Sequence, residues 1–292
     1  MAASRDECVL TGPRTRVAHS KSATYAPDVG QTLELLSLAP SVEVRPTPIL
    51  FVHGAWHGAW CWQEHFLPYF AQHGYGVHAL SLRGHGASSG REHLRWSSIA
   101  DYVSDISQVL QRLPKPPVLV GHSMGGLVIQ KYLEAHWAPA AVLMAPAPPS
   151  GVIRTVRNII AHQPLVFLKA NLTLRLYPII GTPALARTLL FSNTLPEDQF
   201  ARHYSRLQDE AYRAFLDMLF LNLPRPRKVQ LQPLVLGAAN DAVFSVEDVR
   251  STARAYGTNA EIFPNMAHEM MLEEGWQAVA DRILGWLRAQ NL

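Results

Sequence analysis

The stretch VLVGHSMGG (residues 118–126) places a serine between two glycines, directly after an apolar run. The run Val118–Val120 is short and rich in β-branched residues, which predicts a buried strand. Residues 125–133 (GGLVIQKYL) continue with apolar residues at helical spacing. Ser123 is therefore expected at a sharp turn from strand to helix, where Gly121 and Gly125 let the two elements approach closely.

The motif G-x-S-x-G decides little by itself, because it arises by chance in roughly one chain in ten of this length. Its context is informative, since a strand before and a helix after such a serine hold the hydroxyl clear of the sheet as a nucleophile. The alternative is an ordinary serine in a tight turn, with no catalytic role. The rest of the chain has to distinguish the two.

Strands and helices alternate along most of the chain. Further strands are predicted at residues 48–54, 76–82, 140–148, 232–238 and 260–265, and further helices at 62–73, 99–113 and 276–289. This alternation predicts an α/β fold, with a mainly parallel sheet that helices flank on both faces.

We expect three parts in the chain. Residues 1–25 are polar and lack periodicity, so they are interpreted as a flexible N-terminal tail. Residues 26–148 and 233–292 would form the α/β core. Residues 149–232 contain no clear strand but much helical spacing, and a helical insertion after a strand end is typical of a cap or lid.

The composition is that of a globular protein and excludes several classes. The net charge is only +3, and no run of Lys and Arg could follow a phosphate backbone, so no nucleic acid is expected as a partner. We find no secretory signal and no apolar stretch long enough for a transmembrane segment, which favours a cytoplasmic location. Cys8 and Cys61 have no metal or redox spacing, so we expect free thiols, no metal and no cofactor. Nothing here predicts the oligomeric state.

A serine nucleophile needs a base within hydrogen-bond reach and an acid that orients the base. Among 13 histidines, His268 is the best candidate because it follows the last predicted strand. It would thus share the carboxyl edge of the sheet with Ser123, where catalytic groups of such sheets gather. Asp241 follows the preceding strand and is our candidate acid, whereas Glu247 and Asp248 fall inside the next helix.

The negative charge of a tetrahedral intermediate needs backbone N–H donors. The N–H of Met124, directly after the serine, is one candidate for this oxyanion hole. Ala55 is the other, because Gly54 permits a bend after the strand that ends at the same edge.

These residues resemble the α/β-hydrolase family, in its capped serine esterase and lipase-like branch. The resemblance rests on five segments in order: FVHGAWHGAWCW, SLRGHGASSG, GHSMGGLVIQKYL, GAANDAVF and NMAHEMM. The first and last are similar to those of plant methyl-esterases and hydroxynitrile lyases. The resemblance implies a triad of Ser123, Asp241 and His268, in the family's chain order, and oxyanion donors at Ala55 and Met124.

The chain departs from the family's patterns at a few positions. Ser81 stands where many relatives have Asp, so any ion pair of that Asp is absent. No lysine closely follows His268, which disfavours a hydroxynitrile lyase, and Ser rather than Asp at position 123 disfavours a haloalkane dehalogenase or an epoxide hydrolase.

The sequence thus predicts a serine hydrolase that cleaves carboxylic esters through an acyl-enzyme, with a small-molecule ester as its partner. The apolar residues of 163–191 predict a preference for apolar acyl or alcohol groups. Alternatives are a lactonase or thioesterase, a cofactor-free perhydrolase or haloperoxidase-like enzyme, and a receptor-like module that binds its ligand without turnover.

Overall fold

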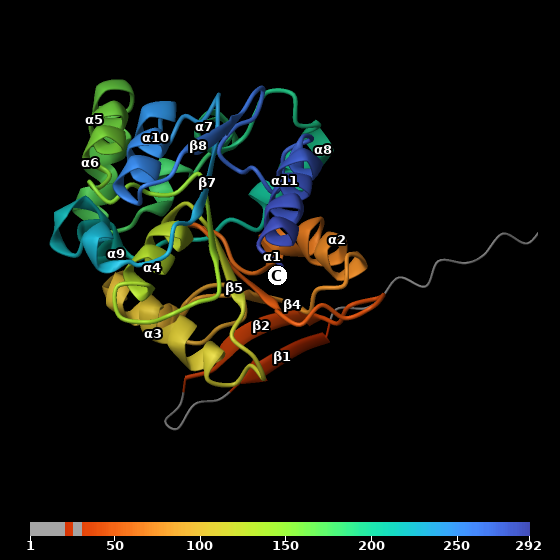
Figure 1. The fold of residues 1–292 in the computed structure, drawn as a ribbon. Coiled ribbons are helices and arrows are strands. Elements are labelled where there is room, and N and C mark those ends of the chain that lie inside the picture. The colour runs from red at the N-terminus through yellow and green to blue at the C-terminus, as the bar shows by residue number, and fades with distance from the viewer. Residues whose placement is uncertain (1–20, 26–30) are drawn as a thin grey trace, which may run out of the picture.

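The centre of the molecule is an eight-stranded sheet in the order β1-β2-β4-β3-β5-β6-β7-β8 (Figure 1). The computed structural model describes residues 21–25 and 31–292. The strands are β1 (Lys21–Tyr25), β2 (Leu33–Leu38), β3 (Ile49–Val52), β4 (Val77–Leu80), β5 (Val118–His122), β6 (Ala141–Met144), β7 (Leu234–Ala238) and β8 (Ala260–Phe263). β2 pairs antiparallel with β1 and β4, and all pairings from β4 to β8 are parallel.

The central strands are buried along their whole length. Every residue of β3, β5 and β6 is buried, as expected for parallel strands with helices on both faces. Their register places Val52 beside Gly121, and His122 beside Met144. Strands β3, β5 and β6 therefore end at the same edge of the sheet, and the loops that follow them come together there.

Helices cover both faces of the sheet. α1 (Trp60–Gln63), α2 (Phe66–Gln72) and α11 (Trp276–Ala289) lie on one side, and α3 (Ile99–Leu110), α4 (Met124–Tyr132) and α10 (Val246–Ala255) lie on the other (Figure 1). A short 3-10 helix, η1 (Arg91–Trp96), precedes α3. α3 begins with a capping box, in which Ser98 and Asp101 satisfy each other's backbone N–H groups.

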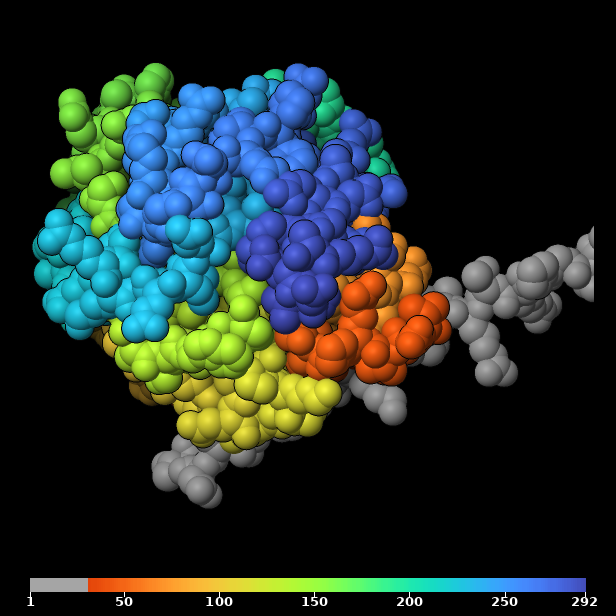
Figure 2. Space-filling model, in the orientation of Figure 1, coloured from red at the N-terminus to blue at the C-terminus, as the bar shows by residue number. Residues whose placement is uncertain are grey.

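Between β6 and β7 the described residues form helices joined by loops, and no strand. The helices are α5 (Ile153–His162), α6 (Pro164–Thr173), η2 (Tyr177–Ile179), α7 (Pro183–Leu190), α8 (Glu197–Tyr204), α9 (Tyr212–Leu216), η3 (Asp217–Leu221) and η4 (Pro226–Lys228). Figure 2 shows α5 (green) and the chain after α9 (cyan) on one side of the molecule, beside α10 (blue). This helical segment follows β6, so it starts at the edge where the central strands end.

The predicted fold class is confirmed, and the differences are local. The helix predicted at 62–73 is two helices, α1 and α2, and the sequence analysis missed β1 and β2. β1 occupies residues 21–25, the last five of the predicted tail over 1–25, and the remainder of that tail lies outside the described residues. Cys61 is a buried free thiol, whereas Cys8 lies outside the described residues. None of the helices in the described part of the chain has both the length and the apolar character needed to span a membrane.

Candidate active site

Ser123 stands at a strained turn between β5 and α4. Its φ is 52° and its ψ is −118°, a conformation that costs a non-glycine residue about 1–3 kcal/mol. Glycines surround it because other residues would not fit. A Cβ on Gly121 would lie 2.6 Å from Cδ1 of Ile129, and a Cβ on Gly125 would lie 2.4 Å from the carbonyl oxygen of His53. The turn is therefore as tight as the two glycines predict.

The three side chains predicted as a triad form one chain of hydrogen bonds. Nε2 of His268 lies 2.9 Å from Oγ of Ser123, and Nδ1 of His268 lies 2.8 Å from Oδ2 of Asp241. The other carboxylate oxygen of Asp241 accepts hydrogen bonds from the N–H groups of Val243 (2.7 Å) and Phe244 (3.0 Å). Asp241 thus accepts a hydrogen bond from the N–H at Nδ1 of His268, which keeps the ring proton there and leaves Nε2 free to accept the serine proton.

The triad is shielded from water, and this affects the pKa of His268. Its side chain is 2% exposed, and that of Asp241 is fully buried. Burial alone would lower the pKa of His268, but the charge of Asp241, its hydrogen bond to Nδ1 and, as the smallest of the three, the charge of Glu269 together outweigh burial, so the pKa lies above the ordinary 6.5. Asp241 therefore stabilises the imidazolium that forms when His268 accepts a proton.

Ala55 and Met124 lie beside Ser123 at the base of an apolar cavity of about 70 Å³. No described residue accepts a hydrogen bond from the N–H of Ala55 or of Met124, so both donors are available to a ligand. The chain bends directly after Ala55, where Trp56 has a φ of 65°. The two predicted donors and the nucleophile thus face one cavity.

The insertion supplies most of the residues in the cavity wall. Besides Ala55, Ser123 and Met124, the cavity is lined by Trp56, Val152, Thr155, Val156, Ile159, Leu176, Ile179, Glu210, Phe215, Met218, Val243 and Phe244. Of the apolar residues in 163–191 that the sequence analysis singled out, Leu176 and Ile179 are in this wall. Leu165 and Leu172 instead point to solvent, with 78% and 77% of their surface exposed. The insertion therefore does contribute apolar surface, through fewer of these residues than the sequence indicates.

A comparison with protein families agrees with this geometry. Residues 49–282 match the model of the alpha/beta hydrolase family, which is most of the chain. The chain belongs to the alpha/beta hydrolase family. The family predicted from the sequence is thereby confirmed.

The proteins similar to this chain include plant esterases. The chain is 38% identical over 96 residues to Methylesterase 3 of Arabidopsis thaliana, covering 32% of this chain and 36% of the relative. It is 34% identical over 95 residues to Methyl jasmonate esterase 1 of Vitis vinifera, with the same two coverages. The matched stretch thus spans about a third of the length of these relatives.

Solved structures extend the likeness of the fold over nearly the whole chain. The crystal structure of an esterase from Rhodococcus sp. ECU1013 superposes with a TM-score of 0.69 at 20% identity, and covers 92% of this chain and 99% of that one. At this identity the likeness concerns the fold alone.

Ser81, which stands where many relatives have Asp, hydrogen-bonds to a carboxylate in this structure. Its Oγ donates a hydrogen bond to Oε2 of Glu34 (2.6 Å) and accepts one from the N–H of Ala59 (2.8 Å). Glu34 lies on β2, which the sequence analysis missed. A carboxylate therefore still reaches this position, but from a neighbouring strand.

The sequence analysis also missed a buried ion pair near the cavity. His85 donates from Nε2 to Oε2 of Glu210 (3.0 Å) and from Nδ1 to the carbonyl oxygen of Arg83 (3.0 Å). Glu210 further accepts hydrogen bonds from Tyr102 (2.7 Å) and from the N–H of Trp56 (3.3 Å). Burial lowers the pKa of His85, but Glu210 raises it by more. The pair thus anchors the bend after Ala55 to the helical insertion, a contact across the chain that no local motif indicates.

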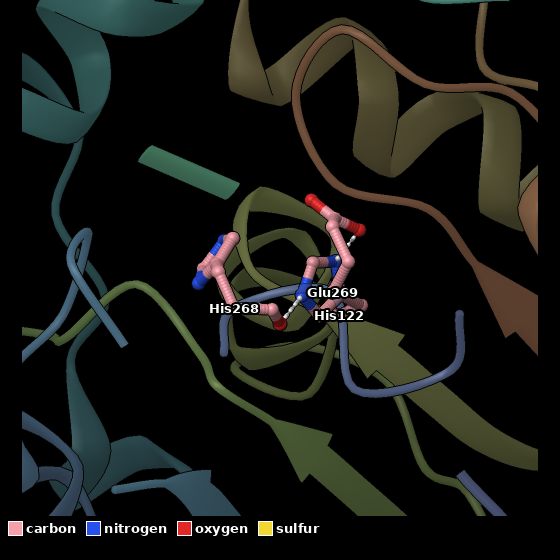
Figure 3. Close-up of side chains that lie close together, drawn as sticks. All are labelled: His122, His268 and Glu269. Carbon is pink, nitrogen blue, oxygen red and sulfur yellow. Dashed lines mark hydrogen bonds and ion pairs between the residues drawn. The ribbon is translucent and has the colours of Figure 1, made fainter. Parts of the chain in front are cut away.

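Two further side chains, His122 and Glu269, lie close to His268 of the triad. One N or O atom each of His122, His268 and Glu269 lies within 4.8 Å of the others (Figure 3). Both ring nitrogens of His268 are used in the triad, and Nε2 of His122 lies 2.9 Å from the carbonyl oxygen of His268. Only Nδ1 of His122 and the carboxylate of Glu269 remain as possible metal ligands in this cluster, fewer than the three or four protein ligands of a typical metal site. This cluster therefore does not point to a metal centre.

Proposed function

We propose that this chain is a serine hydrolase that cleaves carboxylic esters through an acyl-enzyme. The observation that carries the proposal is the continuous hydrogen-bonded chain from Asp241 through His268 to Ser123, whose hydroxyl faces an apolar cavity. The plant relatives named as methylesterases support the same reaction class.

The catalytic roles follow from the hydrogen bonds. Nε2 of His268 removes the hydroxyl proton as Oγ of Ser123 attacks the ester carbonyl. Asp241 keeps the proton on Nδ1 and stabilises the imidazolium. The carbonyl oxygen becomes negative, and the N–H groups of Ala55 and Met124 stabilise it.

The tetrahedral intermediate then collapses. His268 gives its proton to the leaving alcohol as the carbon–oxygen bond breaks, which leaves an acyl group on Ser123. A water molecule repeats the sequence: His268 takes one of its protons, the oxygen attacks the acyl carbon, and the proton returns to Oγ of Ser123. The products are the alcohol and the carboxylic acid, and no cofactor is consumed.

The substrate proposed is a small ester with an apolar acyl or alcohol group. The wall of the cavity is apolar apart from Ser123, Thr155 and Glu210, and each buried methylene of a substrate would contribute about 0.8 kcal/mol. We assign residues 149–232 as the cap that supplies this wall. Lactones and thioesters present the same carbonyl to Ser123, so a panel should include them.

Activity-based labelling tests the proposal. A fluorophosphonate probe should label the wild-type protein on Ser123 and leave Ser123→Ala unlabelled, while a panel of p-nitrophenyl esters reports turnover. Labelling of another serine, or one slow turnover per chain as a receptor-like module would show, would disprove it.

A further inference from the structure

Glu269 is a buried carboxyl that the proposed mechanism does not use. It follows His268 in the chain and is 1% exposed. Its Oε2 lies 3.4 Å from Nε2 of His57 and 3.8 Å from Nδ1 of His122 (Figure 3 shows the contact with His122). These three atoms are buried and have no other hydrogen-bond partner among the described residues. They therefore have only one another to satisfy their hydrogen-bonding capacity.

The other nitrogen of each histidine fixes where the ring protons are. Nδ1 of His57 lies 2.8 Å from the carbonyl oxygen of Ala55, and Nε2 of His122 lies 2.9 Å from that of His268. A carbonyl oxygen only accepts hydrogen bonds, so both of these nitrogens carry a proton. In the neutral rings, Nε2 of His57 and Nδ1 of His122 then carry no proton, and each presents a lone pair toward Oε2 of Glu269.

Neither histidine gains a second proton easily. Burial lowers the pKa of His57 to about 3, a result that its hydrogen bond to Ala55 only partly offsets. Burial also holds the pKa of His122 well below its ordinary value, and the nearby His268 adds to this. An ionised Glu269 would therefore face two lone pairs without a proton between them.

The surroundings of Glu269 favour its neutral form. Burial is the largest effect and raises the pKa of Glu269 to about 8, the charge of His268 lowers it, and the charges of Asp241 and Glu273 raise it. The titratable groups around this cluster come from several elements: His57 and Cys61 from the loop after β3 and α1, His122 from β5, His203 and Arg206 from α8 and its end, Asp241 from the loop after β7, and His268 and Glu273 from the loop after β8.

We propose that Glu269 is a protonated carboxylic acid whose Oε2–H lies toward the lone pairs of His57 and His122 and donates its hydrogen bond to the nearer one, on Nε2 of His57, 3.4 Å away. Through them it acts as a positioning residue for the proposed esterase reaction. His57 donates a hydrogen bond to the carbonyl oxygen of Ala55, the residue whose N–H is the proposed oxyanion donor. His122 donates one to the carbonyl oxygen of His268, the proposed base. Gly54 makes this approach possible, because a Cβ there would lie 2.8 Å from Nδ1 of His122.

Ionisation of Glu269 would impair the site in two ways. The donor to His57 would be lost, and a buried negative charge would lie close to the position where the oxyanion develops. Turnover should therefore fall as pH rises through the pKa of Glu269. A glutamine at this position keeps N–H donors toward both histidines but does not ionise.

The decisive experiment compares Glu269→Gln with the wild type across pH 6–10, with Glu273→Gln as the matched control. Glu273 is a second buried glutamate in the same loop, but its carboxylate accepts a hydrogen bond from the N–H of Ser192 (2.8 Å), away from the two histidines. We expect kcat of the wild type to fall near pH 8, and that of Glu273→Gln to fall at a somewhat lower pH, because the charge of Glu273 no longer raises the pKa of Glu269. Glu269→Gln should lose the alkaline fall, because a glutamine does not ionise. An unchanged alkaline fall in Glu269→Gln would overturn the proposal.

A second measurement separates this proposal from the esterase proposal. The carboxyl carbon of Glu269, labelled with carbon-13 and assigned by its absence in Glu269→Gln, can be titrated by NMR in the inactive Ser123→Ala protein. A neutral carboxyl at pH 6.5 supports the proposal even if no ester is hydrolysed. An ionised carboxyl at pH 6.5 overturns it, whatever the activity.

Discussion

Nε2 of His268 and Oγ of Ser123 lie 2.9 Å apart, although 145 positions separate the two residues in the chain. The parallel sheet makes this contact possible, because β5 and β8 both end at the edge where their loops meet. Every prediction below depends on groups gathered at that edge.

Replacing Ser123 with alanine should lower ester turnover by several orders of magnitude, because triad members act as a unit. The matched control is Ser205→Ala, an exposed serine at the end of α8. Both variants should keep the wild-type circular dichroism spectrum and melting temperature. A Ser123→Ala variant that keeps more than about a few per cent of wild-type kcat would rule out this nucleophile.

Replacing Asp241 with asparagine should cut kcat by roughly 10⁴, because the His268 ring would no longer be held with its proton on Nδ1. Glu247→Gln and Asp248→Asn are the controls. Glu247 pairs with Arg254, and Asp248 caps α10 through Ser245, so neither carboxylate faces the triad. A collapse of activity in either control, with normal activity in Asp241→Asn, would place the acid elsewhere.

The acid limb of the pH profile reports on His268. Only the neutral ring accepts the serine proton, so kcat/KM should rise with pH. Since Asp241 raises the pKa of His268 above 6.5, the midpoint of this rise should lie above 6.5. A profile that is flat from pH 5 to 8, measured with an ester whose hydrolysis without enzyme is subtracted, would contradict a histidine base.

Glu269 should also affect the pH dependence of stability. Its pKa is about 8 in the folded protein, against an ordinary 4.5, so protons favour the folded state. This contribution is complete below about pH 4.5 and is lost as pH rises towards 8, with a slope of up to about 1.4 kcal/mol per pH unit. In urea unfolding at several pH values, the free energy of unfolding of the wild type should therefore fall relative to that of Glu269→Gln. A constant difference between pH 5 and 8 would show that Glu269 is ionised throughout this range.

The sequence predicted the parts of this site that depend on local patterns. The glycines around Ser123, and the strand ends before Asp241 and His268, each leave a signature within a few residues. The predicted contacts between these residues then follow from parallel strands ending at one edge.

The remaining contacts could not be predicted, because they join residues far apart in the chain. Glu210 reaches His85 from the cap, and Glu34 reaches Ser81 from a strand whose sequence, LELLSL, lacks strict alternation. Nor does the sequence show the direction of a side chain in the cap. The helical spacing of 163–191 does not reveal that Leu172 faces solvent while Ile179 faces the cavity.

The last prediction concerns the acyl group of the substrate. If it lies against Ile179 and Phe215, kcat/KM for p-nitrophenyl esters should rise from two carbons towards about six to eight, at up to about 0.8 kcal/mol per methylene, or roughly fourfold. Phe215→Ala would enlarge the cavity and should move the optimum to longer chains. Leu172→Ser, a change at an exposed cap position, should leave the whole series unchanged. A maximum at acetate with a steep fall by butyrate would instead mean that these apolar residues only pack the cap against the core. An altered series in Leu172→Ser would mean that the cap is arranged differently around the substrate.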